Sequence, residues 1–121
     1  MTVSQDIDDI LKEIRENKEM MDAKTGADKL RDLSVLHAYL TSIIADRNKI
    51  YHQKFEEIMN ETVNDKPITV SRAKVKAEAS EEYYQLDKAI KLEVSLMTTI
   101  QSLKLWVRIR QGEEYNSNNL Q

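Results

Sequence analysis

Residues 71–111 read SRAKVKAEASEEYYQLDKAIKLEVSLMTTIQSLKLWVRIRQ, and this stretch decides the fold. It contains neither Gly nor Pro, the residues that most often interrupt regular structure. Apolar residues recur at steps of three and four, a spacing that places them on one face of an α-helix. The repeat predicts an inner seam of Ala79, Tyr83, Leu86, Ile90, Val94, Met97, Ile100 and Val107. We therefore expect one long helix that begins at a Thr69 or Ser71 cap and ends at Gly112.

A second long helix is predicted over residues 28–61 by the same spacing. Its seam consists of Leu30, Leu33, His37, Leu40, Ile44, Tyr51, Phe55 and Ile58, with Arg47 or Asn48 interrupting it. Residues 63–68, VNDKPI, separate the two helices and hold the single proline, which has no amide donor and disfavours helix before it. Two long helices joined by a short loop lie antiparallel, so the sequence predicts a long helical hairpin.

A shorter, acidic helix is predicted over residues 4–23, with Thr2 or Ser4 as its cap and Gly26 at its stop. Its apolar stripe is short and consists of Ile7, Ile10, Leu11 and Ile14. Residues 113–121 are expected to form a polar, frayed tail. The fold class is thus all-α, with residues 1–121 forming a single helical domain.

The composition fits a reducing compartment. The chain has 121 residues and no cysteine, which excludes disulfide scaffolds and thiol chemistry. Its start lacks the basic and apolar segments of a signal peptide, and no stretch is apolar enough for a membrane span. We expect a cytoplasmic protein, in the host cytoplasm if it is viral, with no membrane partner.

Charge is unevenly distributed along the chain, whose net charge is -3. Residues 1–34 carry nine acidic and six basic side chains, whereas residues 67–121 carry seven acidic and eight basic ones. The net charge argues against a protein wrapped in nucleic acid over its whole surface. It permits a local basic patch in the last third of the chain.

The second half of the last helix is apolar on two faces. Beside the seam runs a stripe of Leu92, Leu96, Leu103, Trp106 and Ile109. A helix that is apolar on two sides must be covered on two sides. The first helix could fold back over this stripe, a foreign protein could cover it, or a second copy could do so. We expect self-association, because the first helix is short and the stripe spans several turns.

Catalytic signals are weak in this sequence. His37 and His52 stand fifteen residues apart on one predicted helix, roughly 22 Å, so they cannot share a metal within one chain. Glu78 and Glu81 leave open a magnesium-dependent nucleotide hydrolase, but such a site needs inward carboxylates, and Glu82 points away from the inward face of Tyr83 and Leu86. Two isolated glycines make no phosphate loop, and no nucleophile has a helper. We expect no enzyme activity, cofactor, metal or small-molecule substrate.

Basic residues near both ends of the last helix suggest contact with nucleic acid. Lys76 lies near its start, and Lys104, Arg108 and Arg110 lie near its end, beside Trp106. Cations that track a backbone, together with an aromatic ring that stacks on bases, are typical of proteins that bind single strands. The alternative is a packed Trp106 and cations that complement the helix dipole.

The last helix also resembles the C-terminal region of UvsY, the recombination mediator of tailed phages. The likeness covers residues 75–112 and lies in Val75-Lys76, Ser80, Leu86 and Leu92, then an uninterrupted apolar helix to Ile109-Arg110 and a nearby Gly. The resemblance implies a closed ring of helical subunits that binds single-stranded DNA and assists a recombinase. It also implies Lys76, Lys104, Arg108 and Arg110 as the DNA contacts.

Two functions are therefore expected from the sequence. The first is a non-enzymatic, oligomeric recombination mediator that binds single-stranded DNA and a recombinase. The acidic first helix departs from a DNA-binding surface and would face away from the strand. The alternative is a small phage or bacterial adaptor, or an inhibitor of a host enzyme, that binds protein and ignores nucleic acid.

Overall fold

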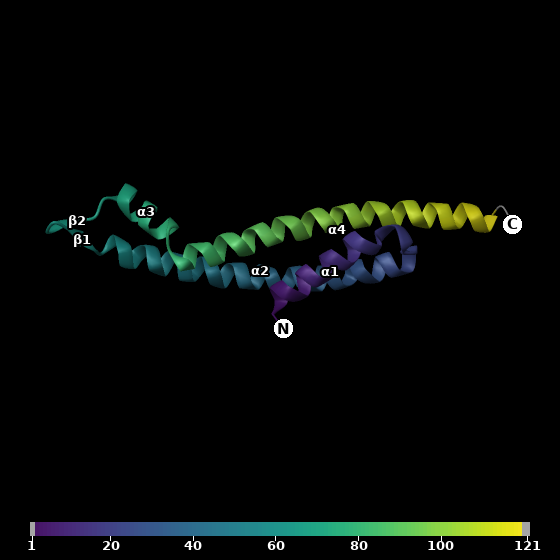
Figure 1. Cartoon of the computed structure of the whole chain (residues 1–121), viewed down its shortest axis with the longest axis horizontal. Coiled ribbons are helices and arrows are strands. Elements are labelled where there is room, and N and C mark those ends of the chain that lie inside the picture. The colour runs from purple at the N-terminus through teal and green to yellow at the C-terminus, as the bar shows by residue number, and fades with distance from the viewer. Residues whose placement is uncertain (1, 120–121) are drawn as a thin grey trace. The chain divides into compact units, whose positions relative to one another are not determined.

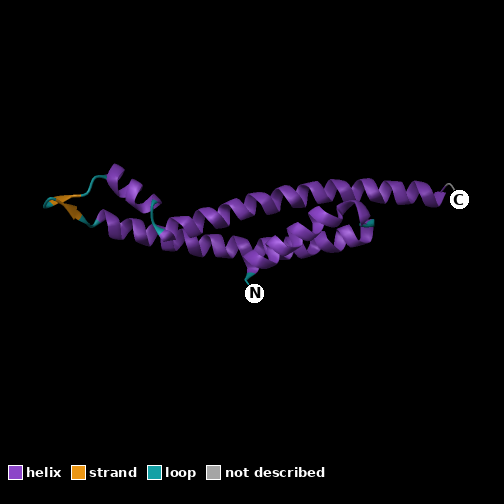
Figure 2. Ribbon diagram, in the orientation of Figure 1, coloured by secondary structure: helices purple, strands orange, loops and turns teal. Residues whose placement is uncertain are grey.

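A computed structural model describes residues 2–119, and their fold is all-α, as predicted. The elements are α1 (Val3–Asn17), a 3-10 turn η1 (Lys18–Met20), α2 (Ala23–Met59), β1 (Thr62–Val63), β2 (Lys66–Pro67), α3 (Val70–Glu78) and α4 (Glu81–Asn119). The two long helices, α2 and α4, pack against each other as the predicted helical hairpin (Figure 1). The strands are a minor part of the chain, as Figure 2 shows.

Side-chain caps begin the helices. A cap is a short side chain whose oxygen accepts a hydrogen bond from a free amide of the first turn. Thr2 accepts from Gln5 N at 3.1 Å and Thr69 from Arg72 N at 3.3 Å, which confirms two predicted caps.

Asp22 is a cap that the sequence analysis missed, since its carboxylate accepts from Thr25 N at 2.7 Å at the start of α2. Hydrogen bonds from the backbone and side chain of Thr25 lower the pKa of Asp22. Because this pKa is depressed in the folded state, the cap stabilises the fold at neutral pH and is lost as the pH falls through the folded pKa.

The predicted stop of the first helix at Gly26 is wrong. The chain turns earlier, through η1, and α2 already begins at Ala23, so Gly26 lies inside a helix and is buried. No glycine in residues 2–119 has a positive φ, so the conformational freedom of glycine is not used here. The missing side chain is what matters. A Cβ atom at position 26 would lie 2.8 Å from Cγ2 of Val107 and 3.1 Å from Cζ3 of Trp106.

The prediction of one helix over residues 71–111 is also wrong at two points. The chain breaks after Ala79, and the hydroxyl of Ser80 accepts from Tyr83 N at 3.2 Å to begin a new helix, α4. Gly112 does not end that helix, which continues to Asn119 through most of the predicted frayed tail. Glu114 explains the extension, because its carboxylate accepts from Ala23 N at 3.1 Å and ties this part of α4 to the start of α2. Residues 120–121 of the predicted tail lie outside the described residues.

The predicted break at residues 63–68 is confirmed, and it contains a tight turn. Thr62 pairs with Pro67 and Val63 with Lys66 in a two-stranded antiparallel ladder. Asn64 and Asp65 connect the strands with φ of 55° and 63°. Positive φ at both central residues is typical of the tightest hairpin turns, and Asn and Asp tolerate that region well.

The chain divides into two compact units, and each is described by itself. Unit 1 comprises Met1–Leu40 and Leu92–Gln121, and unit 2 comprises Thr41–Lys91. In unit 1 the core contains residues of α1 (Ile7, Leu11, Ile14), of α2 (Leu33, Leu40) and of α4 (Leu96, Ile100, Leu103, Val107). The apolar stripe of the first helix therefore docks within the chain, and Figure 1 shows α1 beside the first part of α2.

The predicted seam of the last helix has the right period, and only part of it is buried: Leu86, Ile100 and Val107 belong to the core. Val94, predicted to face inward, is 63% exposed, and Ile90 is 41% exposed. The buried positions are Leu86, Ala89, Leu96, Ile100, Leu103 and Val107. They keep the alternation of three and four residues that antiparallel helix pairs use. The buried face therefore combines Leu86, Ile100 and Val107 of the predicted seam with Leu96 and Leu103 of the neighbouring stripe.

Unit 2 has a small core of its own. Ile58, Ile68, Ala73 and Ala77 are buried together, with Tyr51, Phe55, Met59 and Val63 packed against them. The rings of Tyr51 and Tyr83 lie 5.4 Å apart between centroids and join α2 to α4 within this unit. Burial raises the pKa of the Tyr51 hydroxyl, and the nearby Glu78 and Tyr83 raise that pKa further.

The close contact at Gly26 gives a stability prediction. Gly26→Val should lower the free energy of unfolding by about 2 kcal/mol, because the new side chain overlaps Val107 and Trp106. The matched control is Gly112→Val, since nothing lies within 4 Å of a Cβ atom at that position. We expect it to change stability by less than about 0.5 kcal/mol. Urea denaturation followed by circular dichroism measures both, and equal losses in the two variants would contradict the close approach.

Candidate binding surfaces of unit 1

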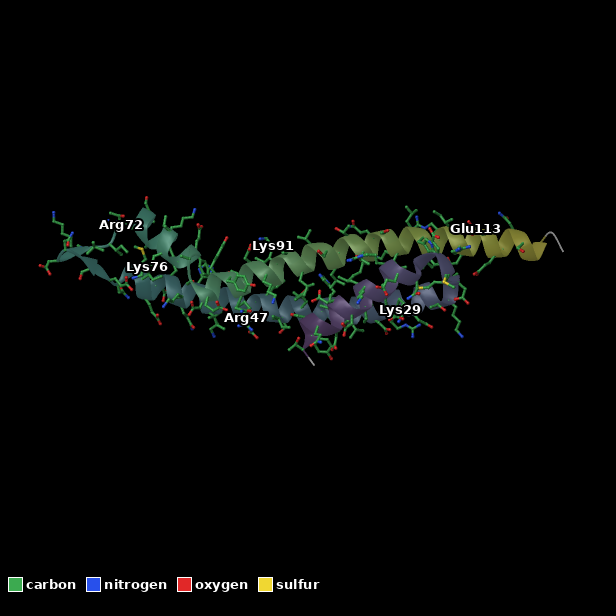
Figure 3. The ribbon with its side chains drawn as sticks, in the orientation of Figure 1. Lys29, Arg47, Arg72, Lys76, Lys91 and Glu113 are labelled. Carbon is green, nitrogen blue, oxygen red and sulfur yellow. The ribbon has the colours of Figure 1, made fainter. Side chains whose placement is uncertain are left out.

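The four basic residues predicted to contact DNA do not form one surface. Lys76, which Figure 3 labels, belongs to unit 2, and the other three belong to unit 1. The ammonium of Lys76 pairs with Glu61. Arg110 donates to the backbone oxygen of Glu19 at 2.9 Å and pairs with Glu113 at 3.1 Å. Two of the four cations therefore already have acceptors in the protein.

Trp106 packs inside unit 1. Its side chain is half-buried against Gly26, and the guanidinium of Arg110 lies 5.2 Å from the ring centroid. A cation over an aromatic ring is stabilised by the negative face of the ring. The ring of Trp106 thus has protein neighbours at its edge and on one face. A packing role for Trp106 therefore agrees with the structure better than stacking on nucleic-acid bases.

The predicted interface stripe is partly a core. Leu96 is fully buried and Leu103 is 1% exposed within a single chain, so their assignment to an intermolecular interface is corrected. The reason is α1, because Leu11 and Ile14 border the same small cleft as Leu103. Folding back of the first helix, one of the alternatives left open by the sequence, covers these positions. Leu92 and Trp106 are half-buried, and Ile109 is 52% exposed.

The histidines occupy different settings. His37 lies on the inner side of α2 in unit 1, where its Nε2 is 3.5 Å from a carboxylate oxygen of Glu93 on α4. This polar pair stands within the hydrophobic seam between Leu33 and Leu40. His52 is exposed, with its ring 5.7 Å from that of Tyr51. Across residues 2–119, no three His, Asp or Glu side chains are grouped as metal ligands would be.

One candidate surface is an exposed strip of α4, formed by Lys104, Leu105, Arg108 and Ile109, which we call the α4 strip. Leu105 is 56% and Ile109 52% exposed, and both cations are exposed as well. Neither Lys104 nor Arg108 forms an ion pair with any residue that the structure describes. Residues 94–112 contain three basic and no acidic side chains, so the strip is both apolar and positive.

The second candidate surface is a groove between α1 and α2, which we call the acidic groove. Asp6, Asp9 and Ile10 of α1 and Asp32, Val35 and Leu36 of α2 line it, around a volume of about 410 Å³. Val35 is 52% exposed, and Tyr39, one turn further along α2, is 58% exposed. The three carboxylates have no ion pair among residues 2–119.

Two cations of α2 near the acidic groove are already paired. Lys29 of α2 binds Glu13 of α1 with 2.8 Å between Nζ and Oε1, and Figure 3 labels Lys29 there. Arg31 pairs with Asp28 at 3.1 Å. The cations closest in sequence to Asp32 therefore hold other carboxylates and do not neutralise this one.

The acidic groove was missed by the sequence analysis. Each helix carries a local signal, since Asp6, Asp9 and Ile10 recur at helical spacing and so do Asp32, Val35 and Leu36. Only the docking of α1 against α2 turns these two half-surfaces into one groove.

Comparison with protein-family models, with curated proteins and with solved structures found no significant match to this chain. The resemblance to UvsY thus stays a prediction. Within residues 2–119, no helix has both the length and the hydrophobicity that crossing a membrane requires.

Proposed function

We propose that this chain is a non-enzymatic, helical protein-binding module whose acidic groove receives a basic, amphipathic helix. The observation that carries the proposal is the groove itself, with three unpaired carboxylates around three apolar side chains.

The chemistry of the acidic groove suits a helix rather than a small molecule. Helices dock into grooves through apolar side chains one turn apart, which enter between the helices of the receptor. Ile10, Val35 and Leu36 provide such an apolar wall. Carboxylates at the rim select a cationic partner and speed its approach, because charge complementarity acts mainly on specificity and association rate.

A peptide titration tests this proposal. We expect a fluorescein-labelled helical peptide of Leu and Lys to bind, and the matched peptide of Leu and Glu not to bind. Asp6→Asn/Asp9→Asn/Asp32→Asn should weaken the complex about tenfold, since an exposed ion pair contributes roughly 0.2–1 kcal/mol. Fluorescence anisotropy at low salt measures the dissociation constants.

The control removes the same charge from a different surface. Asp46→Asn/Glu56→Gln/Glu57→Gln changes exposed carboxylates of unit 2, and it should leave the affinity for the basic peptide unchanged. If both triple variants weaken peptide binding equally, the peptide responds only to net charge, and the acidic groove is not its binding site.

A second candidate function is single-stranded DNA binding, as a recombination mediator that also engages a recombinase. One observation favours it, namely the exposed Lys104 and Arg108, one turn apart on α4 and without ion pairs in the described chain. Because Trp106 packs against Gly26, binding would depend on phosphate contacts more than on stacking.

The DNA candidate predicts a salt-dependent affinity for a labelled single-stranded oligonucleotide. Anisotropy should show steep weakening between about 50 and about 200 mM salt, because bound cations displace counterions from the phosphates. Lys104→Glu/Arg108→Glu should abolish the binding, whereas Lys49→Glu/Lys74→Glu, at exposed positions of unit 2, should reduce it less. If the oligonucleotide is not bound at about 50 mM salt, the mediator function is ruled out.

A further inference from the structure

Unit 1 carries two surfaces that no other part of residues 2–119 covers. The acidic groove lies between α1 and α2, and the α4 strip is exposed on the last helix. Exposed apolar side chains gathered beside unpaired charge are typical of interaction sites rather than of ordinary protein surface. Each surface is therefore a candidate interaction site.

The two surfaces complement each other in charge. The acidic groove has three carboxylates and the α4 strip has two cations, and none of these five groups forms an ion pair within the described part of the chain. Residues 3–17, which form α1, hold five acidic and two basic side chains. Residues 94–112 hold three basic and no acidic ones. Contact between them would neutralise charge on both.

They also complement each other in size and pattern. Leu105 and Ile109 stand one turn apart, and so do Lys104 and Arg108, which places an apolar row beside a basic row on the same helix. Either row spans roughly 6 Å at a rise of 1.5 Å per residue, which matches the spans from Asp6 to Ile10 and from Asp32 to Leu36. The apolar row can enter the groove while the cations reach the carboxylates at its rim.

We propose that the partner helix of the acidic groove is the α4 strip of a second copy of this chain. This inference rests on the proposed function and names the helix that the groove receives. Within one copy the strip is exposed to solvent, so it does not fill the groove of its own chain.

A symmetric contact between two α4 strips fits less well. It would bring Lys104 and Arg108 of one copy against the same cations of the other, and like charges in contact are unfavourable. The contact between strip and groove is heterologous, with different surfaces on its two sides. Each copy has one acidic groove and one α4 strip, so the assembly closes as a pair or a ring, or it continues as a filament. Self-association then uses Leu105 and Ile109, and not the buried Leu96 and Leu103.

Two single-surface variants of the full chain test this pairing. The strip variant is Lys104→Glu/Arg108→Glu, and the groove variant is Asp9→Lys/Asp32→Lys. Sedimentation velocity should show that the wild type self-associates with rising concentration and that each variant alone sediments as a monomer, with association weakened at least about tenfold. Unchanged circular dichroism shows that both variants still fold.

Mixing the variants is the decisive step. The strip variant keeps an intact groove and the groove variant keeps an intact strip, so an equimolar mixture should recover a complex of one copy of each. If the interface were symmetric, both variants would carry the same damaged surface, and mixing them would not restore association. As a control, Lys49→Glu/Lys74→Glu reverses two exposed cations of unit 2 and should associate like the wild type.

Any of three results would overturn the inference. The wild type could stay monomeric at every concentration, the strip and groove variants could associate as the wild type does, or their equimolar mixture could stay monomeric. If the basic peptide still binds to a monomeric chain, the groove serves a different protein and the proposed function stands. If the peptide does not bind either, the proposed function fails together with the inference.

Discussion

The hairpin of unit 1 depends on the close contact of α2 with α4 at Gly26. Only a residue without a side chain fits there, because Val107 and Trp106 occupy the space that a Cβ atom would need. This contact fixes the register of the two helices. Beyond it, Arg110 donates to the backbone of Glu19, and Glu114 accepts from Ala23 N, so the end of α4 is tied to the turn that precedes α2. The helix therefore continues past Gly112.

The packing of α2 against α4 determines which surfaces of unit 1 stay exposed for binding. α1 buries Ile7, Leu11 and Ile14 in the same core and leaves the acidic groove along its border with α2. The cations near the end of α4 then fall into two classes. Arg110 is engaged by Trp106, Glu19 and Glu113, whereas Lys104 and Arg108 face solvent. A tryptophan used for packing and a carboxylate-lined groove favour binding to protein, while the two exposed cations keep DNA as the second candidate.

Much of the fold could be predicted from the sequence, because helix periodicity and caps are local signals. The Thr69 cap, the break at residues 63–68 and the apolar stripe of α1 are such cases. The full set of buried positions in the last helix could not be predicted, since Val94 and Leu96 belong to neighbouring apolar stripes and packing buries some members of each. Gly26 and Gly112 look alike in sequence, yet only Gly26 meets another helix. The acidic groove depends on how α1 docks, which no local pattern reports.

The most direct test of the register is a nuclear Overhauser measurement on the single tryptophan in solution. Trp106 is the single tryptophan of this chain, so its indole N–H signal is unambiguous and the other ring protons can be assigned from it. The account predicts cross-peaks between the ring protons on Cζ3 and Cε3 of Trp106 and the α-protons of Gly26. If those ring protons instead contact residues one or two turns away along α2, the helices pair in another register. The close contact at Gly26 would then be contradicted.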